Sequence, residues 1–343
     1  MSERILVTIL AGLLAVCFRA SAEETAPDFK EVQQVVREHL TGATDESVNR
    51  AAIDGLLLAL KGRAELVPAT VGSATNMPSL VTRQEVLDDG VGYVRIGRVA
   101  AGLADAFAKS AKELGASNKL SGIVVDLRFA GGNDYAAAAA VADLFVKSEL
   151  PLLNGGSGLV SSREKTNAIR LPVVALVNGE TVEAAEALAA VLRQTGVGLL
   201  LGNKTAGRAG VRSDFKLSTG QTLRVVTAPV LLGDAKPVPA TGVVPDIEVS
   251  VKLEAERAFY ADTLATAAKV HTAGQTNATA HSSKRVRLTE ADLVREKRSD
   301  GDFESITNAR VKAEPEVFVI QDPALSRSVD LLKGLAVVRP GGP

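Results

Sequence analysis

Aromatic and sulfur-containing residues are scarce in this chain of 343 residues. There is no tryptophan, and Phe, Tyr and Trp together make up 3% of the sequence, so alanine, leucine and valine must fill the core. The single cysteine, Cys17, excludes an intramolecular disulfide and a thiolate metal site. The three histidines, His39, His271 and His281, are scattered along the chain. We therefore expect no metal centre and no other cofactor.

An excess of charge of one sign is also absent. The chain has 39 Lys and Arg against 40 Asp and Glu, which gives a net charge of −1. Proteins that bind nucleic acid through its phosphates carry a clear positive surplus, so we expect no nucleic-acid partner. The hydrophobic fraction of 46% excludes a disordered chain. The length is sufficient for one large domain or two modest ones.

The first 22 residues are typical of an export signal. Ile5 to Cys17 is largely apolar, and small residues suited to cleavage precede Glu23. As a helix the apolar run would span about 20 Å, less than the ~30 Å hydrocarbon core of a bilayer. We therefore expect a periplasmic or secreted protein with no stable membrane span after cleavage. The alternative is a lipoprotein anchored at Cys17, although Val16 is a poor residue before the lipidated cysteine.

Composition and periodicity divide the rest of the chain into four parts. We expect N-terminal helices at 23–66, a linker at 67–82, a core at 83–252, and a C-terminal extension at 253–343 with a polar linker at 271–283. The extension contains no motif that indicates chemistry. The sequence gives no indication of an oligomeric state.

Capping residues predict where several helices begin. Asp28 is placed to cap the first helix of the N-terminal part, and Thr44 or Asp45 the second. Asp322, followed by proline, is the expected cap of a last helix that ends at Gly334. Both ends of the chain therefore carry helices outside the core.

Strand and helix patterns alternate through the core. Strands are expected at Gly92–Ile96, Gly122–Leu127 and Val173–Val177, and Gly122–Leu127 is a nearly continuous apolar run, as expected for a sheet buried on both faces. Helical patterns are expected at 101–114, 134–146 and 182–193, and a hairpin turn at Thr219-Gly220. This alternation predicts an α/β fold with parallel strands. Periodicity alone does not separate a doubly wound sheet from other α/β arrangements.

Two runs in the second half of the core carry the strongest functional signal. Residues 181–186 read Thr-Val-Glu-Ala-Ala-Glu, and residues 202–209 read Gly-Asn-Lys-Thr-Ala-Gly-Arg-Ala. They resemble the C-terminal processing (tail-specific) serine proteases, in which a serine in Ser-Ala-Ser-Ala-Ser-Glu and a lysine in Gly-x-x-Thr-Phe-Gly-Lys-Gly form the catalytic dyad. With the spacing unbroken, the serine position falls on Glu183 and the lysine position on Arg208. The glutamine that orients the lysine falls on Arg212.

Further landmarks of that family occur in the same order. They are Gly92–Ile96, Asp126-Leu127-Arg128 with Gly131-Gly132, Lys204-Thr205, and Gly242–Asp246. The resemblance implies a ββα superhelix core of the Clp protease and crotonase type, with a helical lead-in and a C-terminal helical extension. The family's PDZ domain, which gathers substrate tails, has only a short linker in its place here.

The residues at the dyad positions cannot perform serine acyl transfer. That reaction needs a hydroxyl, a base within hydrogen-bond reach and donors aimed at the developing oxyanion. Glu183 has no alcohol, and the guanidinium of Arg208 keeps its proton at any working pH. We expect Glu183 to pair with Arg208 and Arg212 in a salt-bridge cluster that fills the old catalytic centre. The alternative is that the three side chains point independently to solvent.

The remaining parts of the site are better preserved. Gly131 and Gly132 lie at a strand-to-helix turn, where backbone N–H groups can bind a carbonyl oxygen of a peptide in the groove. The alternative is a turn that simply needs flexible glycines, and the sequence favours neither. Thr181 is the expected N-cap of the helix that carries Glu183.

These observations lead to one functional expectation with two alternatives. We expect an exported tail-specific protease homologue that is catalytically inactive and binds a peptide or protein partner in its groove. One alternative is an active serine-type endopeptidase with a displaced nucleophile. The other is a crotonase-like enzyme that uses Glu183 for acid/base chemistry.

Overall fold

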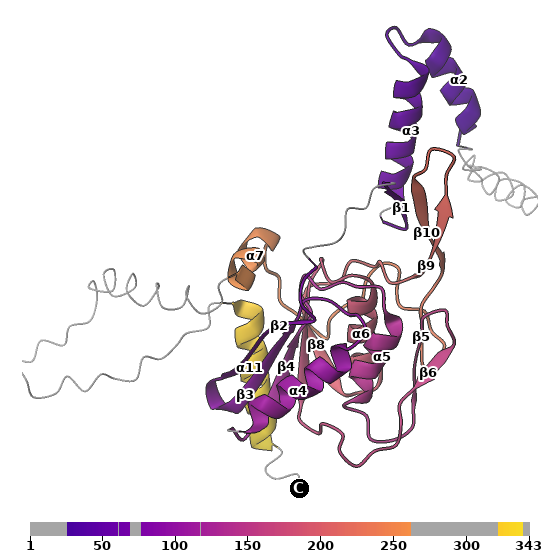
Figure 1. Ribbon diagram of the computed structural model, residues 1–343. Helices are drawn as coiled ribbons and strands as arrows, with labels where there is room; N and C mark the ends of the chain where they lie inside the picture. The colour runs from indigo at the N-terminus through magenta and orange to yellow at the C-terminus, as the bar shows by residue number, and fades with distance from the viewer. Residues whose placement is uncertain (1–25, 61, 69–76, 117, 262–321, 339–343) are drawn as a thin grey trace, which may run out of the picture. The chain divides into compact units, whose positions relative to one another are not determined.

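The computed structural model describes residues 26–60, 62–68, 77–116, 118–261 and 322–338 (Figure 1). The expected signal peptide, with Cys17, and the expected linker at 271–283 lie outside these residues. The chain divides into two compact units, with the boundary between Gly62 and Arg63. No helix within the described ranges is both long enough and apolar enough to span a bilayer.

The first unit is a pair of helices, as the lead-in predicts. Helix α2 is Phe29–His39 and helix α3 is Asp45–Ala59. Asp28 caps α2 by accepting the backbone N–H of Lys30. Thr44, not Asp45, caps α3, and the side chain of Ser47 returns the bond to Thr44 N–H. This reciprocal capping box satisfies two N–H groups that a helix end would otherwise leave without partners.

A six-stranded sheet forms the centre of the second unit, in the order β12-β8-β7-β4-β3-β2. Its strands are β2 (Val81–Leu87), β3 (Val91–Ile96), β4 (Gly122–Asp126), β7 (Val173–Val177), β8 (Gly198–Gly202) and β12 (Ile247–Glu248). All pairings are parallel except that of β2 with β3, so the sheet is mixed with one antiparallel edge. The predicted α/β fold with parallel strands is therefore confirmed for the centre of the sheet.

Helices cover both faces of this sheet (Figure 1). They are α4 (Leu103–Ala116), α5 (Tyr135–Asp143) and α6 (Glu183–Gln194) on one face and α11 (Pro323–Val338) on the other. Strand β4 illustrates why: Ile123 and Val125 point into the core with α4, α5 and α6, while Val124 points into the core with α11. A strand buried on both faces needs apolar residues at successive positions. A further helix, α7 (Leu253–Ala261), precedes the undescribed part of the extension.

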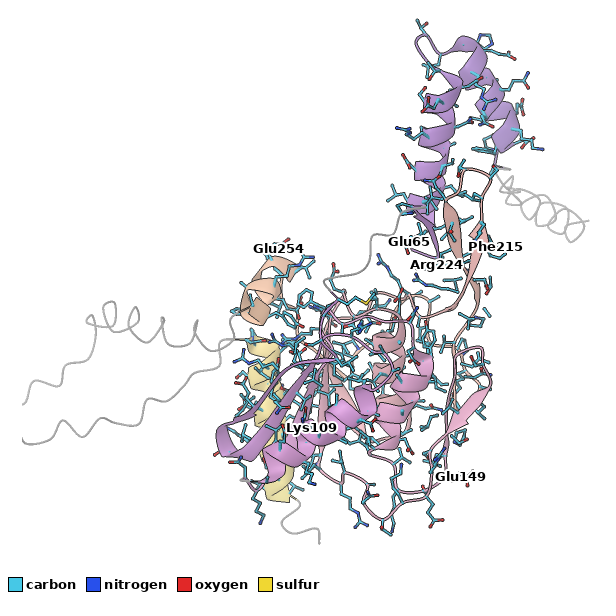
Figure 2. All side chains as sticks on the ribbon, in the orientation of Figure 1. Glu65, Lys109, Glu149, Phe215, Arg224 and Glu254 are labelled. Atoms are coloured by element: carbon cyan, nitrogen blue, oxygen red, sulfur yellow. The ribbon has the colours of Figure 1, made fainter. Side chains whose placement is uncertain are left out.

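Two three-stranded sheets complete this unit. Their strands are β1 (Ala64–Val67), β10 (Thr222–Ala228) and β9 (Val211–Lys216) in one, and β11 (Leu231–Leu232), β5 (Pro151–Asn154) and β6 (Leu159–Ser161) in the other. The expected hairpin is confirmed as β9 and β10. Strand β1, which sequence periodicity did not predict, pairs with β10 and places Glu65 opposite Arg224 (Figure 2).

The last helix begins where the sequence predicts, but it ends later. Asp322 accepts the N–H groups of Ala324 and Leu325 at the start of α11. The helix continues past Gly334 to Val338, so the expected end at Gly334 is wrong. A glycine inside a helix costs only about 1 kcal/mol relative to alanine, which the packing of α11 on the sheet offsets. At that contact a Cβ on Gly122 would lie 2.8 Å from Leu332, so the glycine permits the close approach.

Candidate functional site

Glu183 is the first residue of α6 and has an unusual backbone conformation. Its φ is +55°, in the left-handed region that residues with a side chain rarely adopt. The preceding N-cap is Val182, which makes no side-chain cap bond, so the expectation that Thr181 caps this helix is wrong. Thr181 is buried instead: its hydroxyl accepts Asn178 N–H at 3.0 Å and donates to the Leu127 carbonyl at 2.9 Å. The hydroxyl therefore ties the helix start to the end of β4.

The expected salt-bridge cluster forms with one of the two arginines. Oε1 of Glu183 lies 2.8 Å from Nη2 of Arg212, and Nη1 of Arg212 lies 3.7 Å from Oε2 of Glu65. Arg208 makes no ion pair with any residue in the described ranges, and its side chain is exposed. The expectation that Glu183 also pairs with Arg208 is therefore wrong. Its backbone N–H is held by Glu186 at 2.8 Å, and the side chain is left facing solvent.

Glu186 is the buried acid that organises this region, and sequence reasoning missed it. Its carboxylate has no exposed surface and accepts the N–H groups of Gly207, Arg208 and Ala209 at 2.8 to 3.0 Å. It also accepts a short hydrogen bond from the hydroxyl of Thr205. A carboxylate with this many donors is well compensated for its burial. The available signal was its place in the first turn of a helix between alanines that face the core.

Thr205 joins this carboxylate to a third segment of the chain. Its hydroxyl accepts the N–H of Val243 at 2.7 Å, and its own N–H donates to the Val243 carbonyl at 3.1 Å. Glu186, Thr205 and Val243 belong to three of the landmarks on which the family resemblance rests. The landmarks are therefore parts of one buried hydrogen-bond system that shapes the loop after β8.

The glycine turn after β4 is shaped by close backbone contacts. Gly132 has a φ of +117°, and a Cβ there would lie 2.1 Å from the Val99 carbonyl oxygen. The Gly132 carbonyl accepts the N–H of Ala184 at 2.7 Å, and the Gly131 carbonyl accepts the N–H of Val99 at 2.8 Å. In acyl-transfer enzymes of the nucleophile-elbow type, the N–H of the residue after the nucleophile position is an oxyanion donor. Here that group, in Ala184, already has an acceptor.

A cleft of about 570 Å³ opens beside Glu183 and the glycine turn. Its lining residues include Met77, Arg98, Gly132, Asn133, Tyr135, Gly155, Gly156, Ser157, Glu183, Gly210, Arg212, Asp214 and Arg224. Among the described residues that line it, the only hydroxyls belong to Tyr135 and Ser157, and none is a lysine or a histidine.

The Tyr135 hydroxyl donates to the Gly210 carbonyl and accepts the Gly210 N–H, both at 2.9 Å. Burial raises the pKa of Tyr135, so its phenol stays protonated.

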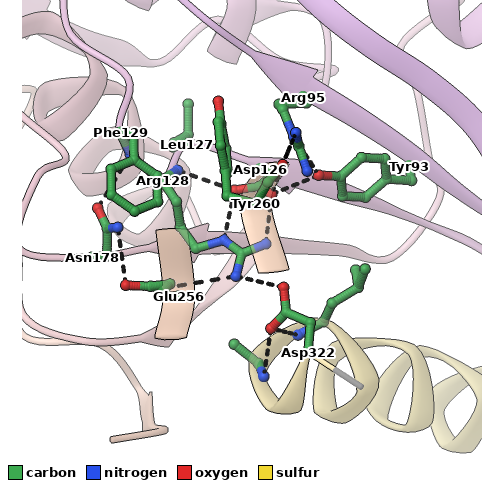
Figure 3. A network of polar contacts seen from close by, with 12 residues as sticks. Tyr93, Arg95, Asp126, Leu127, Arg128, Phe129, Asn178, Glu256, Tyr260 and Asp322 are labelled. Atoms are coloured by element: carbon green, nitrogen blue, oxygen red, sulfur yellow. Dashed lines mark hydrogen bonds and ion pairs between the residues drawn. The ribbon is translucent and has the colours of Figure 1, made fainter. Parts of the chain in front are cut away.

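Asp126 and Arg128, which precede the glycine turn, do not line the cleft but lie in a buried polar network (Figure 3). The guanidinium of Arg128 forms two parallel bonds with the Asp126 carboxylate, at 3.0 and 2.8 Å, and Nη1 lies 2.7 Å from Asp322. Burial opposes ionisation of Asp126, but the Arg128 guanidinium holds the pKa of that carboxyl below its usual range. This motif therefore anchors the start of α11, a role that its sequence did not reveal.

The second side of the network comes from α7. Glu256 accepts the side-chain amide of Asn178 at 3.1 Å and lies 3.8 Å from Arg128. Burial raises the pKa of Glu256. The guanidinium of Arg95 stacks 3.8 Å from the centre of the Tyr260 ring and donates to the Tyr260 carbonyl at 2.7 Å. Two helices of the C-terminal extension are thus attached to the carboxyl ends of the central strands.

The chain is similar to a peptidase family and to carboxy-terminal processing proteases. Residues 90–249 match the model of "Peptidase family S41". The chain is 26% identical over 239 residues to the carboxy-terminal processing protease CtpA of Bacillus subtilis, covering 65% of this chain and 50% of that protein. It is 26% identical over 186 residues to the chloroplastic C-terminal processing peptidase of Tetradesmus obliquus, covering 53% of this chain and 40% of that protein. The chain thus spans half or less of the length of these relatives.

The photosystem II D1 C-terminal processing protease is 25% identical, with a TM-score of 0.40, and the alignment covers 55% of this chain and 47% of that one.

Proposed function

We propose that this protein, whose residues 90–249 belong to peptidase family S41, is an exported pseudoprotease that binds a peptide segment in its cleft without cleaving it. The pairing of Glu183 with Arg212 at 2.8 Å carries the proposal. Glu183 stands at the position that the family resemblance assigns to the nucleophile, and Arg212 at that of the residue that orients the base. The two side chains form an ion pair with each other. Export is supported by the signal-like residues 1–22.

Three features of the site argue against peptide-bond cleavage. The carboxylate of Glu183 offers no hydroxyl to acylate, and Arg208 is an exposed cation with no capacity as a base. The N–H of Ala184 donates to the Gly132 carbonyl, so a substrate oxyanion would have to displace that bond. Each feature removes a different requirement of acyl transfer, and repair of one would leave the others in place.

The cleft itself retains the properties of a peptide-binding groove. Its volume of about 570 Å³ falls within the range of ligand pockets. Gly132, Gly155, Gly156 and Gly210 line it, so part of its wall is main chain rather than side chain. These features support binding of an extended peptide.

The test combines binding with cleavage on the same sample. The protein beginning at Glu23 would be incubated with a library of fluorescent peptides, with anisotropy reporting binding and mass spectrometry reporting cleavage. We expect binding of a subset of peptides, all of them recovered at full length. Cleavage that disappears in Glu183→Ala would contradict the inactive assignment. Absence of binding by every peptide would contradict the proposed binding role.

A further inference from the structure

The charged side chains that line the cleft do not balance one another. Five charged residues line it: Arg98, Glu183, Arg212, Asp214 and Arg224. Arg212 pairs with Glu183, and Arg224 forms two bonds of 2.8 and 3.0 Å with Asp214. Arg98 is the third cation of the lining, and both lining carboxylates are already paired with the other two arginines. Glu65, which lies 3.7 Å from Arg212, is more than half exposed and is not part of the lining.

Arg98 has donors that no acceptor satisfies. Its one hydrogen bond with a described residue joins Nη1 to the sulfur of Met77 at 3.1 Å, and a thioether is a weak acceptor. Its Nε is buried without a partner, as is the Nε of Arg212. No carboxylate of the described residues lies within 4 Å of the Arg98 guanidinium. The third nitrogen, Nη2, makes no hydrogen bond with a described residue and is not among the buried atoms, so it is a donor that a ligand acceptor can reach.

The backbone places Arg98 beside the former reaction centre. Arg98 forms a β-bridge with Gly131, and the N–H of the next residue, Val99, donates to the Gly131 carbonyl. This bridge fixes the start of the Arg98 side chain next to the glycine turn. A ligand that entered the cleft along that turn would therefore meet a guanidinium fork with free donors.

We propose that the cleft selects ligands that carry a carboxylate, which Arg98 binds with its guanidinium fork. This inference rests on the proposed peptide-binding function and names the chemistry of the segment that is bound. A guanidinium and a carboxylate match in a planar, two-bond geometry, and charge-assisted bonds are about twice as strong as neutral ones. The carboxylate belongs either to an Asp or Glu side chain or to the free C-terminus of the peptide.

Three fluorescent peptides of equal length distinguish these sources. The first has internal glutamates and an amidated C-terminus. The second replaces the glutamates by glutamines and keeps the amide. The third is the glutamine peptide with a free C-terminus. We expect one or both carboxylate-bearing peptides to bind about tenfold more tightly than the neutral one, with an affinity that falls as salt rises.

Variants at Arg98 assign the effect to this residue. Arg98→Gln is expected to reduce the carboxylate preference to near unity. Arg98→Lys should keep part of it, because the charge remains and the fork is lost. The matched control is Arg170→Gln, an exposed arginine that lines a different pocket. It should leave the preference unchanged.

The outcomes separate this inference from the proposed function. Equal binding of all three peptides by the unmodified protein would overturn the carboxylate preference and leave peptide binding intact. A preference that persists in Arg98→Gln would overturn the role of Arg98. Absence of all binding would overturn both proposals. The comparison of peptides on the unmodified protein decides the first point even if a variant fails to fold.

Discussion

The carboxylate of Glu183 lies 2.8 Å from the guanidinium of Arg212. The two residues stand on α6 and β9, at positions that the family resemblance assigns to a nucleophile and to the residue that orients a lysine base. Both side chains are largely shielded, with 22% and 15% of their surface exposed. An ion pair of this kind contributes about 1 kcal/mol to stability. It occupies the position that the family resemblance assigns to the nucleophile.

The positive φ of Glu183 predicts an inverted order of two substitutions. Inside a helix alanine is more stable than glycine, but a φ of +55° costs a residue with a Cβ about 1 to 2 kcal/mol. We expect Glu183→Gly to be more stable than Glu183→Ala by about 1 kcal/mol in urea unfolding. Both variants lose the ion pair with Arg212, so that loss cancels in the comparison.

Lys109 provides the control for this comparison. It lies within α4, with an exposed side chain and no unusual φ. Lys109→Ala should be more stable than Lys109→Gly by about 1 kcal/mol. The same order at both positions would show that the backbone at Glu183 is not strained.

Glu186 should matter more for stability than Glu183. Glu186→Gln keeps the shape of the side chain but replaces one carboxylate oxygen by an NH₂ group, which then faces either the N–H of Gly207 or the N–H groups of Arg208 and Ala209. We expect a loss of about 3 kcal/mol in the free energy of unfolding. Glu183→Gln, at the more exposed carboxylate, should cost about 1 kcal/mol or less. Equal effects at the two positions would mean that Glu186 does not hold the loop after β8.

The anchor between Arg128 and Asp322 predicts a strong effect far from the cleft. Asp322→Asn removes a charge 2.7 Å from a fully buried guanidinium and weakens the cap of α11. Loss of one partner of a buried ion pair costs about 3 to 5 kcal/mol. Thermal and urea unfolding would measure it. Asp330→Asn, at an exposed position of the same helix, should leave the unfolding free energy nearly unchanged.

Restoration of the dyad alone should not restore activity. The triple variant Glu183→Ser, Arg208→Lys, Arg212→Gln supplies the side chains that the resemblance requires. Position 208 faces solvent, however, and the N–H of Ala184 donates to Gly132. A lysine base needs burial to lower its pKa, so we expect no turnover of a C-terminally tagged peptide above that of the unmodified protein. Measurable turnover would mean that the backbone retains a working oxyanion site.

Several parts of the fold could be predicted from the sequence because their signals are local. Strand β4 carries an unbroken apolar run, and Thr44 and Asp322 stand directly before the helices that they cap. Strand β1 could not be predicted in this way, since the strand with which it pairs, β10, lies about 160 residues later. Pairing over such a separation leaves no periodic signal in a four-residue segment.

In the candidate site, too, local features could be predicted from the sequence and features that depend on distant residues could not. Residue identity alone at Glu183 and Arg208 shows that the positions assigned by the resemblance hold neither a serine nor a lysine. The direction of the Arg208 side chain cannot be predicted from residue identity, because it depends on the hydrogen bonds that Glu186 makes to the backbone of the loop after β8. Arg128 is a similar case: a charged residue on a glycine-rich turn resembles a groove residue until its partner Asp322, far along the chain, is in place.

The most direct test of the proposal that the cleft is inactive is labelling with a fluorophosphonate, which reacts with activated hydroxyl nucleophiles, followed by intact-mass measurement. We predict no added mass on the folded protein, because no lysine or histidine of the described residues lines the cleft beside Ser157 or Tyr135. An active serine protease labelled in parallel gives the positive control. A stoichiometric adduct that maps to a hydroxyl in the cleft and disappears on unfolding would contradict the account.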